Sequence, residues 1–400
     1  MLIVQKFGGT SVGDLDRIAS VASRVAITKK EGNDVVVVVS AMSGETNKLV
    51  SYAKHFSENP SKKEMDMLLS SGERVTSALL AIALTQMGVE AVAMTGRQAG
   101  ILTDSVHTCA RIESIDTTKL KESLSSGKVV VVAGFQGITK EGNISTLGRG
   151  GSDLSAVALA GALKADLCEI YTDVDGICTT DPRIVSEARK IDKISYDEML
   201  EFASMGAKVL QNRSVELAKK LNVTLVTRSS FSDNPGTLIT KEEDIMEKPA
   251  VSGIALDKNQ ARVTLRGITD KPGVAADIFV ALGENDINID MIIQNVGQDG
   301  TTNLGFTIPK NELEAAKRVL EDLNPTKLIE YDDDIVKVSV VGVGMKSHSD
   351  VASSAFAALA EENINIQMIS TSEIKISMAI DAKYSELAVR TLHRAYELEK

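Results

Sequence analysis

Unbroken runs of valine are the feature that most restricts how this chain can fold. "DVVVVVSAM" (34–42) and "KVVVVAGF" (128–135) are as long as strands and have no polar face. Such strands must be covered on both sides, as in a parallel sheet between two layers of helices. Helical patterns separate these runs from further expected strands at 2–7, 90–96, 167–176 and 223–229. Residues 1–240 therefore predict an α/β domain with a mostly parallel sheet and helices on both faces.

An internal repeat follows a charged, proline-ended stretch that we interpret as a linker, residues 241–250. "INIDMI" (287–292) in the first copy is echoed by "INIQMI" (364–369) in the second. Each copy has the pattern strand, loop, helix, strand, strand, helix, and two copies are too few for a solenoid. We predict two small packed domains within 251–400, the first at about 262–335 and the second at about 336–400. The extra strand 251–257 is expected to complete the second copy's sheet.

Composition argues against several classes of partner. A net charge of −11 and the absence of tryptophan disfavour nucleic-acid binding. The apolar runs are far shorter than a membrane span, and no signal peptide opens the chain. The three cysteines are scattered, which fits a reducing compartment, and the four histidines stand far apart in sequence. We expect a cytoplasmic protein without a protein-bound metal centre.

Four polar turns follow expected strands, where ligands of open α/β sheets bind. They are "KFGGTS" (6–11), "SAMSGETN" (40–47), "LGRGGSD" (147–153) and "YTDVDGICTTDPR" (171–183). Taken singly, each is explained equally well as a glycine turn with a helix cap. Together they supply two glycine-rich backbones, Lys6 and Arg149, which suit a polyphosphate and a carboxylate.

Glu73 in "SSGERVTSALL" has two interpretations. A glutamate on a helix is usually solvated. Gly72 and two serines precede it, however, so this helix end could approach a ligand closely. A buried carboxylate at this place would favour a substrate ammonium group.

Together and in this order, the motifs "KFGGTS", "SAM..ETN", "SSGER", "GRGGSD", "YTDVDG" with "TTDPR", and "MGAKVL" resemble those of an aspartokinase of the amino acid kinase superfamily. The repeat, with "DKPG", "GMKSH" and "STSEI", resembles that family's paired ACT domains, which are ferredoxin-like βαββαβ units. The resemblance covers essentially the whole chain. No homoserine dehydrogenase segment follows the second copy, so the resemblance is to a monofunctional member.

The resemblance implies transfer of the γ-phosphoryl group of ATP, with Mg²⁺, to the β-carboxylate of L-aspartate. The product is 4-phospho-L-aspartate, the first step of lysine, threonine and methionine biosynthesis. A carboxylate with a pKa of roughly 4 is already ionised at neutral pH, so no general base is needed. The reaction needs alignment and charge neutralisation instead. The implied catalytic residues are Lys6, Arg149 and Asp153, with Asp153 orienting Lys6.

The resemblance also assigns binding residues. Those implied for ATP are Lys6, Gly8, Gly9, Thr172, Asp173, Arg183, Lys208 and Val209. Those implied for aspartate are Ser40, Thr46, Glu73, Arg149, Gly150, Gly151 and Ser152. Those implied for an effector, lysine or threonine or both, are Asp270, Ala275, Asn288, Ile289, Asp290 and Gln294. Cys178 departs from the pattern, because many relatives carry tyrosine there, and its nucleotide contacts stay open.

The resemblance further implies a homodimer through the ACT domains, and in some relatives a shorter chain from an internal start, here Met246. Two other functions remain. One is a kinase for glutamate or N-acetylglutamate, against which the ACT repeat and "SSGER" argue. The other is a non-catalytic amino-acid sensor, against which intact Lys6, Arg149 and Asp153 argue.

Overall fold

The computed structural model describes residues 1–400 except 205–208, 246–249, 297–299, 327, 344 and 346–348. The chain forms two compact units. The first comprises Met1–Ile177, Lys190–Ala203 and Lys208–Met246, and the second comprises Cys178–Arg189, Ser204–Ala207 and Glu247–Lys400.

This division differs from an uninterrupted domain over 1–240, because the segment Cys178–Arg189 packs with the second unit. Val185 lies in the same hydrophobic core as Val251 and Leu392. The amide of Ile254 also donates a hydrogen bond of 2.7 Å to the carbonyl of Thr179.

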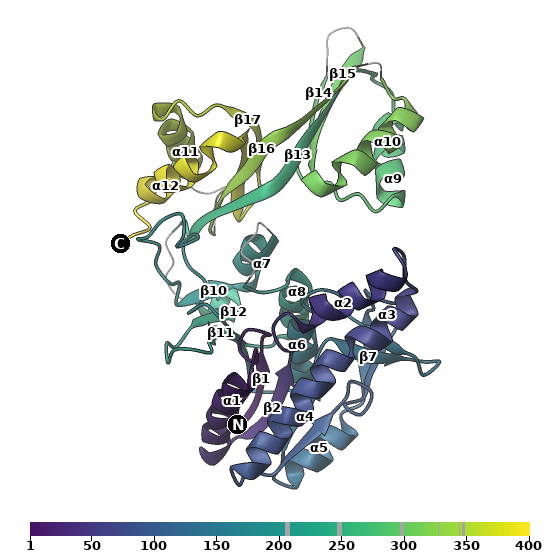
Figure 1. Ribbon diagram of the computed structural model, residues 1–400. Coiled ribbons are helices and arrows are strands. Elements are labelled where there is room, and N and C mark those ends of the chain that lie inside the picture. Colours follow the sequence, from purple (N-terminus) through teal and green to yellow (C-terminus); the bar gives the residue numbers. More distant parts are fainter. Residues whose placement is uncertain (205–208, 246–249, 297–299, 327, 344, 346–348) are drawn as a thin grey trace. The chain divides into compact units, whose positions relative to one another are not determined.

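The first unit is built on an eight-stranded sheet with the order β10-β12-β11-β9-β1-β2-β6-β3 (Figure 1). Neighbouring strands are parallel except for the pair β11 and β12. The predicted mostly parallel sheet is confirmed. The strands are β1 (Leu2–Phe7), β2 (Asp34–Val39), β3 (Ala91–Met94), β6 (Val129–Ala133), β9 (Leu167–Thr172), β10 (Lys193–Ser195), β11 (Leu225–Ser229) and β12 (Thr237–Thr240).

Helices cover both faces of this sheet, as the valine runs require. On one face, α1 (Leu15–Lys30) and α4 (Ser71–Gln86) pack on Val35, Val37 and Val39. α6 (Gly151–Leu163) is buried along almost its whole length and contacts β1, β2 and β9, and α8 (Asn212–Leu221) packs on it (Figure 1). Because successive strand residues alternate between the faces, both faces of β2 lie in apolar surroundings.

A smaller four-stranded sheet, β5-β4-β7-β8, extends the first unit and was not predicted from the sequence. Its strands are β4 (Ile101–Thr103), β5 (Ile112–Ile115), β7 (Gln136–Thr139) and β8 (Ile144–Thr146). The remaining helices of the unit are α2 (Glu45–Phe56), α3 (Lys62–Leu69), α5 (Thr118–Ser125), α7 (Tyr196–Ser204) and the 3₁₀ turn η1 (Glu242–Asp244).

One helical stretch, Lys62–Gln86, is long and apolar enough to cross a membrane by length and composition. Half of its most apolar window is buried inside the protein. The stretch is divided into α3 and α4, and α4 packs on α1 and β6. It therefore has the properties of a core helix of a globular domain.

The second unit is built on one six-stranded antiparallel sheet with the order β14-β15-β13-β16-β18-β17. Its strands are β13 (Gly253–Thr269), β14 (Ile292–Val296), β15 (Thr301–Ile308), β16 (Leu328–Val341), β17 (Ile366–Thr371) and β18 (Lys375–Asp381). Its helices are α9 (Val274–Glu284), α10 (Leu313–Leu323), α11 (Ser349–Glu361), α12 (Ser385–Ala395) and the short η2 (Lys310–Glu312) and η3 (Ala382–Tyr384).

Both copies of the repeat share the two long strands β13 and β16. The first copy uses the later part of β13 and the early part of β16, where Val263 pairs with Tyr331. The second copy uses the other ends, where Gly253 pairs with Val341. The extra strand expected at 251–257 is therefore the beginning of β13, and each copy has its own hydrophobic core on one continuous sheet.

Candidate active site

The centre of the parallel sheet is a topological switch point. The chain continues from β1 to β2 on one side, whereas β9 lies on the other side of β1. The loops after β1, β2 and β6 are tied together at this edge by backbone hydrogen bonds from Gly8 to Tyr171, Ser40 to Phe7 and Gly134 to Val39, of 3.0–3.2 Å. Ligands of open α/β sheets bind at such a point.

Lys6 and Asp153 form a buried ion pair at this edge. The Lys6 Nζ lies 2.6 Å from the Asp153 Oδ1, and the two side chains are only 11% and 10% exposed. Lys6 stands near the end of β1, and Asp153 lies in the first turn of α6. Two glycine-rich turns far apart in sequence are therefore joined through their charged residues.

The turn after β1 leaves backbone amides available. The carbonyl of Gly8 accepts hydrogen bonds from the amides of Ser11 and Val12. No hydrogen-bond acceptor for the amides of Gly9 and Thr10 occurs within the described part of the chain. A Cβ at Gly8 would lie 3.4 Å from the Lys6 Nζ, so glycine keeps the space beside the ammonium group open. Free amides beside a cation suit a phosphate group.

Glu73 lies in the first turn of α4 and is only 4% exposed. Burial raises the pKa of its carboxyl from 4.5 to about 7. Hydrogen bonds from its own backbone amide and from that of Ala41 lower the pKa, but by less. Its Oε2 has no hydrogen-bond partner among the described residues. A buried carboxyl oxygen without a partner beside the loop after β2 suits a cationic group of a ligand.

Arg149 is exposed at the tip of the turn that leads into α6. Its carbonyl accepts a hydrogen bond of 2.6 Å from the Gln211 Nε2, whereas its guanidinium has no ion-pair partner in the described segments. Gly150 has a φ of 74°, and a Cβ there would lie 2.9 Å from the Gln211 Cβ. The turn is therefore held by its backbone, and the guanidinium is left for a ligand.

The other residues expected around aspartate lie beside this turn or at the neighbouring strand. Ser152 is buried, and a Cβ at Gly134 would lie 3.0 Å from its Cβ. Gly151 donates a backbone hydrogen bond to Gly148. Thr46 is half-buried in the first turn of α2, which follows Ser40 and the end of β2.

The residues expected around the nucleotide are divided between the two units. Thr172 ends β9, and its hydroxyl donates to the neighbouring Asp173 at 3.1 Å. Val209 is half-buried just before α8. Arg183 belongs to the second unit and is paired with Asp181 at 2.7 Å.

Lys208 lies outside the described residues, as does Met246. Cys178 begins the segment that packs with the second unit.

Three of the six residues expected to bind an effector line one cavity of about 340 Å³ in the second unit: Asp270, Ala275 and Gln294. The other three do not line it. Asn288 is hydrogen-bonded to Glu312, Ile289 packs on the first copy's core, and Asp290 is paired with Lys337.

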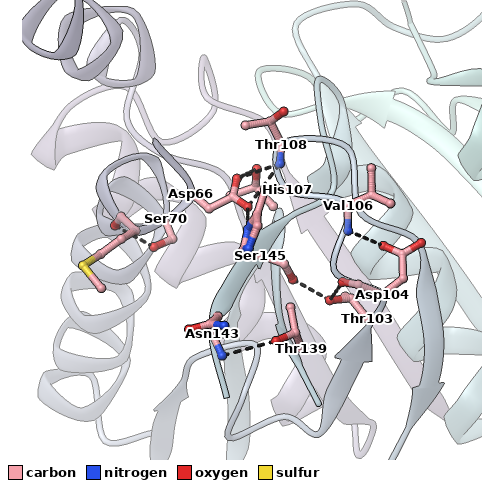
Figure 2. Close-up of polar contacts among 12 residues, drawn as sticks. Asp66, Ser70, Thr103, Asp104, Val106, His107, Thr108, Thr139, Asn143 and Ser145 are labelled. Carbon is pink, nitrogen blue, oxygen red and sulfur yellow. Dashed lines mark hydrogen bonds and ion pairs between the residues drawn. The ribbon is translucent and has the colours of Figure 1, made fainter. Parts of the chain in front are cut away.

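Two residues with a place in this architecture were missed in the sequence. Gln211 holds the turn at residues 147–150, called the Arg149 turn below, and no sequence pattern indicates that contact. Asp66 is completely buried in α3 and holds a cluster of polar groups (Figure 2). Its signal was available, because "EMDMLL" places an aspartate inside an apolar helical run.

The chain is similar to known proteins over its full length. Residues 1–228 match the Amino acid kinase family, and residues 263–323 and 338–396 match the ACT domain. The aspartokinase of Helicobacter pylori strain J99 is 62% identical over 405 residues, covering 100% of both chains. The aspartokinase of Pseudomonas aeruginosa is 56% identical over 404 residues, covering 100% of this chain and 98% of its own.

Among solved structures, E. coli aspartokinase III in complex with aspartate and ADP (R-state) has a TM-score of 0.84 at 26% identity, with 99% of each chain covered. The chain therefore belongs to the amino acid kinase family and, within it, to the aspartokinases. It is an ATP-dependent kinase, and the predicted family, fold class and enzyme class are confirmed.

Proposed function

We propose that the enzyme transfers the γ-phosphoryl group of ATP to the β-carboxylate of L-aspartate. A carboxylate oxygen forms a bond to the γ-phosphorus while the bond from that phosphorus to the β,γ-bridging oxygen breaks. The products are 4-phospho-L-aspartate and ADP. This reaction would stand first in the synthesis of lysine, threonine and methionine, in the cytoplasm.

The observation that carries this proposal is the buried ion pair between Lys6 and Asp153 beside the free amides of Gly9 and Thr10. The Lys6 ammonium and these amides can stabilise the negative charge on a phosphoryl group during its transfer. Asp153 keeps the Lys6 ammonium in place and accepts no proton from substrate. E. coli aspartokinase III, which has the same fold, has been crystallised with aspartate and ADP.

For aspartate, we assign the α-ammonium group to Glu73 and a carboxylate to Arg149. Glu73 offers an unpartnered buried oxygen, and Arg149 offers a guanidinium without an ion-pair partner in the described segments. Arginine binds carboxylates through two parallel hydrogen bonds. Ser40, Thr46 and Ser152 would supply hydroxyl contacts.

Mg²⁺ would enter with ATP. No group of three or more His, Cys, Asp or Glu side chains among the described residues could hold a metal ion. Mg²⁺ keeps several waters and binds mainly through substrate phosphates at such sites, so it does not require a cluster of protein ligands. When bound, it would offset negative charge on the phosphates, and the protein's own contribution there is Lys6.

For regulation, we propose that lysine, threonine or both bind the cavity lined by Asp270, Ala275 and Gln294. An aspartate carboxylate and an amide can pair with an amino acid's ammonium and carboxylate groups. A structure of E. coli aspartokinase III contains lysine and aspartate in a T-state, with a TM-score of 0.77 at 26% identity. Effector binding would favour one of two arrangements of the enzyme.

A hydroxamate assay with ATP tests the reaction. We expect turnover of L-aspartate and none of L-glutamate or N-acetyl-L-glutamate. Turnover of none of the three would contradict the enzyme proposal, and a preference for L-glutamate would mean that the proposed substrate is wrong.

Adding lysine and threonine singly and together identifies the effector, and Asp270→Asn should reduce inhibition while leaving kcat unchanged. A shorter product beginning at Met246 would be visible as a second band from the native gene.

A further inference from the structure

Asp66 is a completely buried carboxylate that no function discussed so far uses. It accepts hydrogen bonds from the His107 Nδ1 at 2.7 Å, the Thr108 amide at 3.0 Å and the Thr146 hydroxyl at 2.5 Å. Figure 2 shows its carboxylate pointing from α3 toward the turn that carries His107 and Thr108. A buried charge is costly unless it is fully hydrogen-bonded, and here three donors converge on it.

These bonds hold the base of the Arg149 turn. Thr108 has a φ of 69°, a backbone conformation that is rare for a non-glycine residue. Its carbonyl lies against Gly148, where a Cβ would approach it to 3.3 Å. Thr146 ends β8, three residues before Arg149. Asp66 therefore contacts the two chain segments that lie beside the Arg149 turn: the turn at residues 107–108 and the end of β8 at Thr146.

The same helix also leads to Glu73. α3 ends at Leu69 and continues through Ser70 directly into α4, whose first turn contains Glu73. The carbonyl of Ser70 accepts a hydrogen bond of 2.9 Å from the Gln136 Nε2, which fixes this junction on β7. One rigid helix end thus relates the group proposed for the substrate ammonium to the turn proposed for its carboxylate.

We propose that Asp66 is a positioning residue for the aspartate-binding half of the active site, setting the Arg149 turn relative to Glu73. This rests on the proposed function. Asp66 touches neither substrate. Its loss should displace the aspartate-binding groups, whereas the Lys6–Asp153 pair, which sits on β1 and α6, keeps its own contacts.

β8 provides a matched control. Ser145, adjacent to Thr146, has a buried hydroxyl that bonds the Thr103 hydroxyl at 2.6 Å, away from Asp66 (Figure 2). Ser145→Ala and Thr146→Val each remove one buried hydroxyl from neighbouring positions of one strand. A general loss of stability would affect both variants, whereas loss of positioning would affect only the second.

The test is steady-state kinetics of the full-length enzyme, varying L-aspartate at saturating ATP and ATP at saturating L-aspartate. Thr146→Val and the isosteric Asp66→Asn should raise the aspartate KM by roughly tenfold to a hundredfold, the effect of a displacement of about 1 Å. The ATP KM should change less than about twofold in both. Thr146→Ser should restore the aspartate KM, and Ser145→Ala should match the wild type.

Two results would overturn the proposal. One is an aspartate KM unchanged in both Asp66→Asn and Thr146→Val. The other is that Asp66→Asn and Thr146→Val both raise the aspartate KM and the ATP KM in parallel, or both lose their folded structure by circular dichroism. Either outcome would make Asp66 merely structural.

Arg149→Ala separates the two proposals. If it leaves the aspartate KM unchanged, the assigned aspartate site is wrong; if it raises KM while the Asp66 variants do not, only the positioning role fails.

Discussion

At the scale of single residues, the Lys6–Asp153 pair combines stability with reactivity. Each side chain is about one-tenth exposed, so neither charge is well solvated without the other. Removing one partner of a buried pair leaves an uncompensated charge, which is more damaging than removing both. The pair's effects on folding and on catalysis can therefore be separated by mutation.

Lys6→Met should lower kcat by about 10²–10³-fold, as expected for loss of one group that stabilises the transition state. It should also lower the free energy of unfolding by about 3 kcal/mol, because Asp153 is left unpaired. Adding Asp153→Asn should recover most of the stability and none of the activity. Urea unfolding and the hydroxamate assay measure the two effects, and near-normal turnover of Lys6→Met would remove Lys6 from the active site.

The raised pKa of the buried Glu73 carboxyl predicts a dependence of the enzyme on pH near neutrality. The pKa of this carboxyl is about 7 in the folded protein and 4.5 in the unfolded chain. Between these two pH values the carboxyl is protonated in the folded state and ionised in the unfolded state. Its contribution to stability is therefore fully present below about pH 4.5 and is lost as the pH rises through 7. The ionised form that a substrate ammonium needs is the one that burial disfavours.

The aspartate KM should fall as the pH rises from 6 to 8, by up to about tenfold per unit below pH 7, because Glu73 must ionise to bind an ammonium group. Glu73→Gln should have a high aspartate KM without this slope. It should also be more stable than the wild type by a margin that grows from about pH 5 to pH 7 and levels off above it. The same slope in Glu73→Gln would show that another group titrates.

Much of the site was predictable at this scale because each motif lies at a strand end. Lys6, Gly8 and Ser40 follow from that rule, whereas the pairing of Asp153 with Lys6 was implied only by the family resemblance. Gln211 and Asp66 did not, because their partners are brought together only by the packing of α8 and α3. Periodicity indicates that a position is buried but not which polar groups will meet it.

At the scale of elements, glycines decide how closely the active-site loops approach. A Cβ at Gly72 would lie 2.7 Å from the Ala41 Cβ, so only glycine lets α4 begin beside the loop after β2. Gly283 in α9 is different, since a Cβ there would meet nothing within 4 Å. Gly72 is needed for the close contact between α4 and the loop after β2, whereas Gly283 only lowers the stability of its helix.

Gly72→Ala should destabilise the first unit by about 1–3 kcal/mol through overpacking, and it should raise the aspartate KM because Glu73 is the next residue. Gly72→Ala with Ala41→Gly should relieve the clash. Gly283→Ala should instead stabilise its helix by roughly 0.5–1 kcal/mol. Hydrogen exchange of each unit reports these changes, and a tolerated Gly72→Ala single variant would contradict the packing argument.

The valine runs predicted the large sheet well because they are strand-length, rich in a β-branched residue and without a polar face. The small sheet escaped notice because its strands are short. β4 and β8 have three residues each, too few for a periodic pattern. The unit boundary also could not be read from the sequence, since Cys178–Arg189 follows β9 of the first unit after a short turn but packs with the second unit.

At the scale of the whole molecule, the second unit has two open sheet edges. β14 and β17 are the edge strands, and they occupy equivalent places in the two copies. Ile292 on β14 is 51% exposed and Ile369 on β17 is 42% exposed. Among the described residues these edges have no further strand beside them, and edges with exposed apolar side chains favour pairing with another chain. The expected dimer through this unit would use such edges.

We expect a dimer formed through these edges, and Ile292→Lys with Ile369→Lys should then shift the full-length enzyme toward monomer, because charged edge residues oppose strand pairing. Sedimentation velocity at several concentrations measures the change. The double variant should also be inhibited less strongly by the effector, because we expect inhibition to depend on the dimer. A matched change on a helix, Val280→Lys, should leave the mass unchanged; a dimer that survives the double variant would place the interface elsewhere.

The sharing of β13 and β16 has a consequence for how the protein is made. The second copy begins with residues 253–257 and finishes at the C-terminal helix, so it encloses the entire first copy along the chain. On the ribosome, the first copy can close once β16 has emerged, whereas the second must wait until α12 has left the exit tunnel. During that interval the opening segment of β13 can pair with the end of β16, but the residues of α11, β18 and α12 that complete the second hydrophobic core are still missing. This is when chaperone binding to the nascent chain should be strongest.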